Sequence, residues 1–335
     1  PIHTLELDRR QRQMCIRDRA NGEIRKNAKE MDVFQAVEGE DSIYPDGLTT
    51  EEALGQLDQL TKDSGSPFFL AVGIIRPHLP FGAPAKYMKH YQGVELPPIP
   101  HPSKPTGKTT WHASGEFMKY NRWGRNPNDD LDFATEVRRH YAACVTYADA
   151  QVGRLMRRLK ESGCDDDTIV VLWGDHGWKL GDYGSWCKHT NFELDTHVPL
   201  IYSGPGIPNG ARSEALVEYI DIYPTLVDWC GLPIPAQCEG VSMTSLFDDP
   251  SRPWKTAAFS QYPRGGGMGY TMRSGAWRYT EWRSKDGTVT DRELYDHSES
   301  DVAAENLIGR PEHVRIVNRM KRLLKSGPEA AKPEQ

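Results

Sequence analysis

The longest periodic stretch of the chain runs from Leu131 to Glu161, where apolar side chains recur at spacings of three and four residues. This spacing predicts a helix with one apolar stripe. Its arginines and lysines then form a solvated face rather than a binding patch. Ser162-Gly163 ends the helix, and the apolar run 168–172 follows it. A helix followed by a strand is typical of α/β sheets.

Two short apolar runs, 66–75 and 168–172, are rich in β-branched or aromatic residues and are predicted to be buried strands. The first runs into Arg-Pro-His-Leu-Pro-Phe at 76–81, and the second into Trp-Gly-Asp-His-Gly-Trp at 173–178. Open α/β sheets place ligands just outside the carboxyl ends of their strands. The Asp-His pair is therefore a candidate site.

The segments around these strands have weaker patterns. Residues 44–47 predict a turn, residues 49–52 a helix start with an N-cap and an acidic first turn, and 84–91 a short helix. Residues 93–127 lack a clear period and predict a long surface excursion. In it, Trp111, His112 and Trp123 could touch a sugar ring, although exposed packing is the more ordinary explanation.

After residue 203 the predicted elements become shorter. Residues 216–220 predict a strand, and Asp221 then caps a helix that ends at Gly231. Short strands separated by Gly or Asp turns follow residue 250, and a last helix is expected at about 312–324. The predicted strands are 257–262, 269–273, 277–282 and 292–296. This texture predicts a small antiparallel α+β subdomain at 251–327 and a polar tail at 328–335.

The pair Asp175 and His176 joins two groups that can bind a metal or move a proton. The ordinary alternative is an Asp that caps a turn beside a His that bonds the backbone. Lys188 follows in the stretch Trp-Cys-Lys-His-Thr-Asn-Phe at 186–192. A Gly-rich loop that presents Asp, His and Lys suits an anionic ligand held by a cation and a metal.

At this point the chain resembles the sulfatase family, within it the iduronate-2-sulfatase-like branch. The matching stretches are Gly-Asp-His-Gly-Trp at 174–178, Leu180-Gly181, Gly184, Trp186, Lys188, Asn191-Phe192 and Thr-His-Val-Pro-Leu-Ile at 196–201. The block at 76–81 matches a second motif of that branch. Prolines on both sides of His78 fix the backbone there and remove N–H donors.

The resemblance implies a mixed, largely parallel α/β sheet flanked by helices, as in alkaline phosphatases and sulfatases. It implies that Asp175 and His176 complete a site for one divalent ion, usually Ca²⁺, and that Lys188 neutralises a sulfate oxygen. His78 would contact the sulfate or protonate the leaving oxygen. His197 and Asn191 are weaker candidates whose place in the match could be architectural. Fixed positive groups help because charge spreads over the sulfate oxygens during attack at sulfur.

Sulfatases use a Cys, in a Cys-x-Pro-x-Arg or Cys-x-Ala-x-Arg context, that is oxidised to formylglycine. Cys15 has an Arg four residues later but Arg17 where the Pro or small residue belongs, and no other Cys has that Arg. The family's early acidic pair is missing too. Met-Cys-Ile-Arg-Asp at 14–18 also matches one reading frame of a library-preparation transposon end. We therefore interpret 1–19 as a non-native junction and 20–250 as a catalytic domain without its amino-terminal part.

Two other classes stay open. Phosphatases and phosphodiesterases of the same superfamily use Asp-His metal ligands, normally with zinc, and a Ser or Thr nucleophile. The second class is a catalytically inactive fragment, which is the outcome expected of the chain as given. For the whole protein the resemblance implies a sulfated uronic acid or another sulfated carbohydrate as substrate, and a periplasmic, secreted or lysosomal place.

Composition adds exclusions. The chain has 335 residues and a net charge of −6, so nothing indicates a nucleic-acid surface. No apolar run is long enough to cross a bilayer. Six cysteines in this length do not make a disulfide framework. Cys230 and Cys238 flank a Pro-containing loop and could pair or stay isolated thiols.

Overall fold

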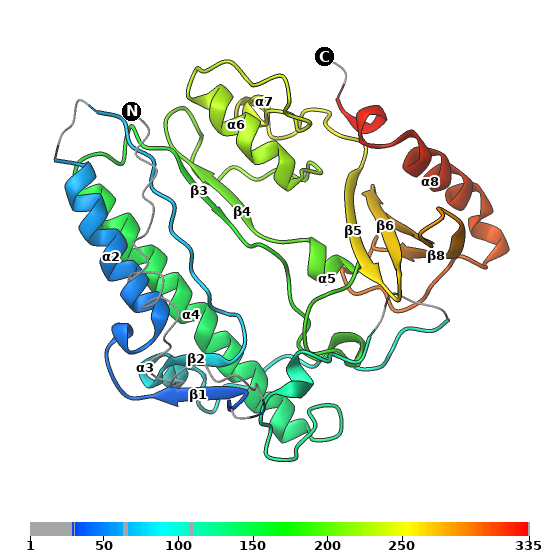
Figure 1. Ribbon diagram of the computed structural model, residues 1–335, viewed down its shortest axis with the longest axis horizontal. Helices are drawn as coiled ribbons and strands as arrows, with labels where there is room; N and C mark the ends of the chain where they lie inside the picture. Colours follow the sequence, from blue (N-terminus) through cyan, green and yellow to red (C-terminus); the bar gives the residue numbers. More distant parts are fainter. Residues whose placement is uncertain (1–28, 30, 63–65, 108–109, 111, 334–335) are drawn as a thin grey trace. The chain divides into compact units, whose positions relative to one another are not determined.

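The computed structural model describes residues 29, 31–62, 66–107, 110 and 112–333. They fall into two compact units, which are drawn in Figure 1. The first unit comprises residues 1–99 and 114–168, and the second comprises residues 100–113 and 169–335. Each unit is described by itself. The predicted junction at 1–19, with Cys15, lies outside the described residues.

The first unit is built on helix α4 (Leu131–Glu161), whose bounds are those predicted. Its N-cap is Asp130, whose carboxylate accepts a hydrogen bond from the Phe133 amide at 2.9 Å. Helix α2 (Pro45–Leu60) lies beside it (Figure 1). A parallel pair of strands, β1 (Phe34–Val37) and β2 (Phe81–Pro84), packs against α4 with Phe34 opposite Phe81.

Helix α2 begins four residues earlier than predicted, so the expected turn at 44–47 is wrong. Pro45 occupies the first helical turn, where its missing N–H costs nothing, and Tyr44 before it is extended. Gly47 lets the first turn of α2 lie close to the backbone of Asp41, because a Cβ at position 47 would lie 2.1 Å from the Asp41 carbonyl oxygen. A short 3-10 helix, η2 (Asp41–Ile43), precedes α2.

The predicted buried strand at 66–75 is wrong in two respects. Among its described residues, 66–75, none is paired in a ladder, and the side chains alternate between exposed and partly buried. Phe69 is 64% exposed and Ile75 is 49% exposed. An apolar run predicts a strand only where a neighbouring strand takes up its backbone hydrogen bonds. Here the carboxylate of Asp46 takes up two of them, from the Ile75 and Arg76 amides.

The rest of the first unit follows the sequence pattern. The short helix predicted at 84–91 is α3 (Ala85–Met88) continued by η3 (Lys89–Tyr91). The described part of the excursion 93–127 holds one 3-10 helix, η4 (Phe117–Lys119), and no strand or α-helix. Trp123 is half exposed and its ring lies 5.2 Å from that of Phe34. Trp111 lies outside the described residues.

In the second unit, β3 (Val170–Trp173) pairs antiparallel with β4 (Leu200–Ser203). The strand predicted at 168–172 is confirmed as β3, but the prediction that it is buried is wrong, since β3 is only partly buried and Trp173 is 51% exposed. Between these strands lie η5 (Asp182–Gly184) and α5 (Glu193–Thr196). The loop 174–199 thus connects two strand ends that lie side by side, Trp173 and Leu200.

Residues 216–220 do not form the predicted strand. The carboxylates of Glu218 and Asp221 bond each other's backbone in a capping box, which bends the chain into η6 (Tyr219–Asp221). The predicted helix follows as α6 (Ile222–Trp229), and α7 (Thr244–Asp248) comes next. Cys230 and Cys238 are both free thiols.

The carboxyl-terminal part of the second unit is a four-stranded antiparallel sheet, as the small antiparallel subdomain predicted from the sequence requires. Its strands are β5 (Ala258–Arg264), β6 (Gly267–Ser274), β7 (Trp277–Arg283) and β8 (Val289–Asp296). Gly265 and Gly266, with φ of 56° and 83°, make the β5–β6 turn that other residues disfavour.

Helix α8 (Val314–Ser326), preceded by η7 (Pro311–His313), packs against this sheet (Figure 1). The fully buried residues between them include Met272, Tyr279 and Met320. The tail expected at 328–335 begins with η8 (Pro328–Ala331), and Ala331 is buried in the same cluster. Burying such side chains is the main term that holds a small sheet and one helix together.

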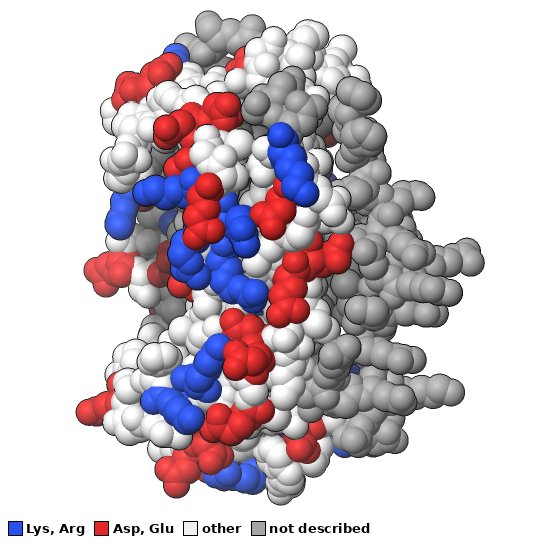
Figure 2. Space-filling model, turned by 90° about the vertical axis from the view of Figure 1, so that its left-hand side faces the viewer, with Lys and Arg blue, Asp and Glu red and all other residues white. Residues whose placement is uncertain are grey.

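Charge is mixed on the face of the molecule that Figure 2 shows. The face in Figure 2 carries acidic and basic side chains side by side rather than one basic area. On α4, Arg158 Nε lies 3.5 Å from Asp58 and 3.8 Å from Glu161. These pairs support the prediction that the arginines of α4 form a solvated face. No helix within the described ranges is long and apolar enough to span a membrane.

Candidate functional site

The loop after β3 presents Asp175 and His176. The Asp175 side chain is 84% exposed, and its Oδ1 accepts a hydrogen bond from the His176 amide at 3.0 Å. His176 Nδ1 lies 3.0 Å from the Gly177 carbonyl oxygen. A carbonyl only accepts, so Nδ1 carries the proton and Nε2 keeps its lone pair.

That lone pair faces the neighbouring carboxylate, because His176 Nε2 lies 3.6 Å from Asp175 Oδ2. Two ligands of one Ca²⁺ at about 2.4 Å and a right angle to each other lie about 3.4 Å apart. The pair can therefore hold one cation from two sides. The alternative, a turn-capping Asp and a backbone-bonded His, accounts for Asp175 Oδ1 and His176 Nδ1. It does not account for the approach of Asp175 Oδ2 to His176 Nε2.

Glycine is required at position 177. A Cβ there would lie 1.9 Å from the Leu194 carbonyl oxygen, and the Gly177 amide donates to the Asp195 carbonyl at 2.9 Å. On the other side, the Tyr219 hydroxyl donates to the Gly174 carbonyl. Burial, and then the charge of Asp175, raise the pKa of Tyr219 to about 12, so it stays a donor. The loop is thus fixed at both ends of the Asp-His pair.

Lys188 and His176 both lie near the ring of Trp178. The Nζ of Lys188 is 4.8 Å from the centroid of the Trp178 ring, and the His176 ring is 6.4 Å from the same ring. Lys188 is only 7% exposed. The structure thus brings His176 and Lys188 to one ring, that of Trp178, and Asp175 lies beside His176.

A buried ion pair that the sequence did not reveal fixes the Lys188 segment. Lys179 is fully buried, and its Nζ lies 2.6 Å from Asp195 Oδ1 and 3.2 Å from Thr190 Oγ1. The Thr190 amide donates to Asp195 at 3.0 Å. One carboxylate therefore holds both ends of the turn 179–190. No sequence signal distinguishes this buried lysine from an exposed one.

The carbonyl of Lys188 is held as well. His112 Nε2 donates to it at 2.8 Å. Burial of the ring lowers the pKa of His112, and this outweighs the hydrogen bond to Lys188, which acts in the opposite direction. His112 thus contacts the Lys188 backbone. The sequence alone suggests for this residue only exposed packing or a contact with a sugar ring.

His78 belongs to the first unit. Its Nδ1 lies 2.8 Å from the Leu79 carbonyl oxygen and its Nε2 lies 3.4 Å from Glu116 Oε1. Both neighbours are acceptors, so Nδ1 donates to the Leu79 carbonyl and the Glu116 carboxylate faces Nε2. The two amides that Asp46 binds, of Ile75 and Arg76, fix the backbone just before it.

The two weaker candidates have structural partners. Asn191 is 1% exposed, and its Nδ2 donates to the Gly269 carbonyl at 3.2 Å, which ties the loop to β6. His197 is exposed beside two acids, with Nδ1 3.8 Å from Glu193 and 3.6 Å from Asp301. Arg278 already pairs with Glu193 at 2.6 Å. These contacts favour an architectural role for both.

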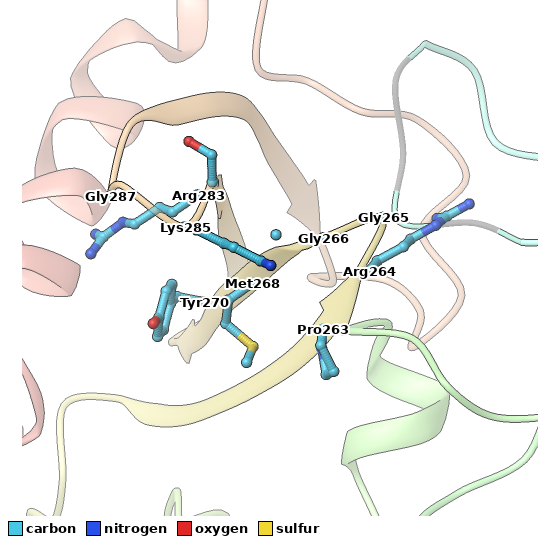
Figure 3. Close-up of a pocket in the computed structure, with 11 residues that line it drawn as sticks. Pro263, Arg264, Gly265, Gly266, Met268, Tyr270, Arg283, Lys285 and Gly287 are labelled. Carbon is cyan, nitrogen blue, oxygen red and sulfur yellow. The ribbon is translucent and has the colours of Figure 1, made fainter.

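A pocket of about 610 Å³ opens at the turns of the carboxyl-terminal sheet, and none of the predicted site residues lines it (Figure 3). Arg264 and Arg283 point to opposite sides of it, and Lys285 extends between them. Arg283 is paired with Glu281 at 2.8 Å, and Arg264 donates to the Thr110 carbonyl. The two guanidinium groups are therefore engaged elsewhere, which disfavours a sulfate clamp here.

Comparison with known proteins gives two family matches. The family model described as Sulfatase matches residues 13–232, and that of the N-sulphoglucosamine sulphohydrolase carboxyl-terminal region matches residues 181–329. The chain is 32% identical to iduronate 2-sulfatase of Homo sapiens over 78% of its own length. It spans 60% of the length of that relative.

Solved structures agree in fold. A protein solved in complex with its substrate D-glucosamine-2-N,6-O-disulfate aligns with a TM-score of 0.74 at 19% identity, covering 85% of this chain and 69% of the other. A phosphonate monoester hydrolase from Silicibacter pomeroyi aligns with a TM-score of 0.67 at 25% identity, covering 95% and 65%.

Proposed function

Because the chain belongs to the sulfatase family and has its alkaline-phosphatase-like α/β fold, as predicted, we propose that it supplies part of the active site of a sulfuric-ester hydrolase. The substrate is a sulfated sugar or polysaccharide unit, and the reaction is like that of iduronate 2-sulfatase. The observation that carries the proposal is that His176 and Lys188 lie near one ring, that of Trp178, with Asp175 Oδ2 3.6 Å from His176 Nε2.

In this proposal Asp175 Oδ2 and His176 Nε2 hold one Ca²⁺. Calcium prefers oxygen ligands, so His176 is the unusual member. A bound calcium ion supplies fixed positive charge for the sulfate oxygens. The exposed carboxylate and the lone pair on Nε2 fit such an ion. With two ligands from the described loop, binding by this chain is weak.

Lys188 carries the second positive charge. Its ammonium is a compact point charge, and the aromatic face of Trp178 and the low exposure of the side chain keep it from being dispersed in water. It neutralises a sulfate oxygen as negative charge grows during attack at sulfur. The nucleophile in this proposal is the formylglycine that the family makes from a Cys, supplied from outside the described residues.

His78 is proposed to give its proton to the leaving sugar oxygen or to contact the sulfate. The Leu79 carbonyl accepts from Nδ1 and orients the ring, and the Glu116 carboxylate lies beside Nε2, the nitrogen that would carry the proton to be given. A structural imidazole held by the same two acceptors is the competing explanation.

A phosphoryl hydrolase is the second candidate, because a phosphonate monoester hydrolase is among the relatives in structure. Lys188 and the His78 segment favour the sulfatase. The complete protein should cleave an aryl sulfate when Ca²⁺ is present and cleave an aryl phosphate diester far more slowly. The reverse preference would assign it to the phosphoryl hydrolases. The chain as given is expected to turn over neither substrate.

The metal site can be tested in the chain itself. Tb³⁺ replaces Ca²⁺, and its luminescence is sensitised by a nearby tryptophan, here Trp178. We expect a weak, Ca²⁺-competed signal that Asp175→Asn and His176→Ala abolish. Asp182→Asn, in the same loop, is the matched control and keeps the signal. Equal luminescence from Asp175→Asn and Asp182→Asn would remove the proposed ligand pair.

A further inference from the structure

A second group of metal-ligating side chains lies in the same unit as Lys188. His112, Cys187 and His189 each offer one ligand atom, and these three atoms lie within 4.8 Å of one another. We propose that they form a binding site for a zinc ion, separate from the Asp175–His176 pair. This proposal stands whether or not the proposed function is correct, since none of its ligands takes part in that function.

The ligand set selects the metal class. A thiolate with two imidazoles suits Zn²⁺, whereas calcium takes oxygen ligands. Ligand atoms of a tetrahedral zinc lie about 3.3–3.9 Å apart when the bonds are 2.0–2.3 Å long. A spacing within 4.8 Å therefore requires only small side-chain adjustments. Three protein ligands leave the fourth position to a water molecule.

The surroundings favour binding of this kind. Cys187 is fully buried, and its Sγ lies 3.4 Å from the Lys188 carbonyl oxygen. The same oxygen accepts the hydrogen bond from His112 Nε2 at 2.8 Å. A neutral imidazole carries one proton, so the ring nitrogen that does not face the carbonyl keeps a lone pair. A hydrogen bond from a ligand ring to a backbone carbonyl is the usual support of a zinc-bound His.

His189 is held in a costly conformation. Its φ is 76°, in the left-handed region that non-glycine residues rarely adopt. Its ring lies 6.3 Å from that of His112 and 5.8 Å from that of Tyr262. Residues in such conformations cluster at functional sites.

Binding releases the thiol proton of Cys187 to solvent, because the thiolate is the ligand. Lys188 lies between the ligands Cys187 and His189 in the sequence. A bound zinc ion therefore fixes the backbone that carries the Lys188 ammonium. Occupancy of this site would then set the position of a residue assigned to the sulfate.

Cobalt(II) serves as the spectroscopic probe for the whole chain. We expect wild-type protein with Co²⁺ to show thiolate-to-cobalt charge transfer and the strong visible bands of a tetrahedral site. Zn²⁺ should displace the signal and Ca²⁺ should not. Cys187→Ser should remove the charge-transfer band, and His189→Ala should weaken Co²⁺ binding more than about tenfold.

Three controls keep the result specific. Cys230→Ser, which changes an exposed thiol of the same unit, should leave the band unchanged. Asp175→Asn should also leave it unchanged, which separates this site from the proposed calcium ligands. Circular dichroism checks that Cys187→Ser is folded, and His189→Ala gives a second reading if it is not. A wild-type protein without the band, or one in which both variants keep it, overturns the proposal.

Discussion

The Nζ atom of Lys188 lies over the ring of Trp178, 4.8 Å from its centroid. The contact is a cation–π interaction at a nearly buried position, where it contributes about 1–2 kcal/mol. The ammonium is thus oriented by an aromatic face that also contacts His176.

Replacing that charge tests the role of Lys188. In the complete protein, Lys188→Met should lower kcat/KM for an aryl sulfate by about 100-fold or more, because one fixed donor to a developing charge contributes that much. The protein should remain folded, since Met fills the same space over Trp178. Lys285→Met, at the pocket of Figure 3, is the control. Equal activity of the two variants would exclude Lys188 from catalysis.

Lys179→Met should act on stability instead. It leaves the Asp195 carboxylate buried without its cation, which costs about 3–5 kcal/mol. Urea denaturation should show this loss, and the double variant Lys179→Met with Asp195→Leu should recover much of it. Arg310→Met breaks an exposed pair with Glu305 and should cost less than about 1 kcal/mol. A loss no larger for Lys179→Met than for Arg310→Met contradicts the structure.

Gly177→Ala should disturb the loop that carries the metal ligands. The added Cβ would meet the Leu194 carbonyl oxygen at 1.9 Å, so the backbone must move. We expect loss of the Tb³⁺ signal together with a lower melting temperature. Gly309→Ala, where the added Cβ meets no atom within 4 Å, is the matched control and should leave both unchanged. An intact Tb³⁺ signal in Gly177→Ala would show that the loop is looser than described.

His140 should make stability depend on pH. Its ring stacks on Phe34 with centroids 4.2 Å apart, and burial lowers the pKa of His140 from 6.5 to about 4. Between these values the unfolded chain binds the proton and the folded chain does not. Stability therefore falls as the pH drops from about 6.5 to about 4, by up to about 3 kcal/mol.

His140→Phe keeps the stacked ring and removes the proton. Its free energy of unfolding, measured by urea denaturation, should vary less across this pH window than that of the wild type. His90→Phe is the control for removal of an exposed histidine from the same unit. A parallel pH dependence of the wild type and His140→Phe would assign the effect to other groups.

Local patterns predicted the elements that local forces define. Helix α4 has a long apolar stripe and the Asp130 cap, and the strands of the last sheet are separated by turn residues such as Gly265. The prediction was wrong where a distant partner decides. Residues 66–75 have the composition of a strand, but the carboxylate of Asp46 takes the backbone hydrogen bonds of Ile75 and Arg76.

The site shows the same division. The motif around Asp175 and the position of Lys188 could be predicted because they are contiguous in sequence. The pairing of Lys179 with Asp195, and the approach of His112 to Cys187 and His189, join residues that are 16 and 75 or more positions apart. Only the folded backbone brings them together. The assignments of His78, Lys188, Asp175 and His176 to catalysis stay predictions until the variants are measured.

The hydrogen bond from Asn191 to the Gly269 carbonyl has a consequence for dividing this protein. A Cβ on Gly269 would lie 2.5 Å from Asn191 Nδ2, so β6 and the loop that carries Lys188 pack closely at this point. Arg278 of β7 likewise neutralises Glu193 in α5. A shortened chain that stops at residue 250 would leave that acid buried without its cation and the loop without its support. The last sheet is therefore part of the support that gives the loop around Lys188 its conformation.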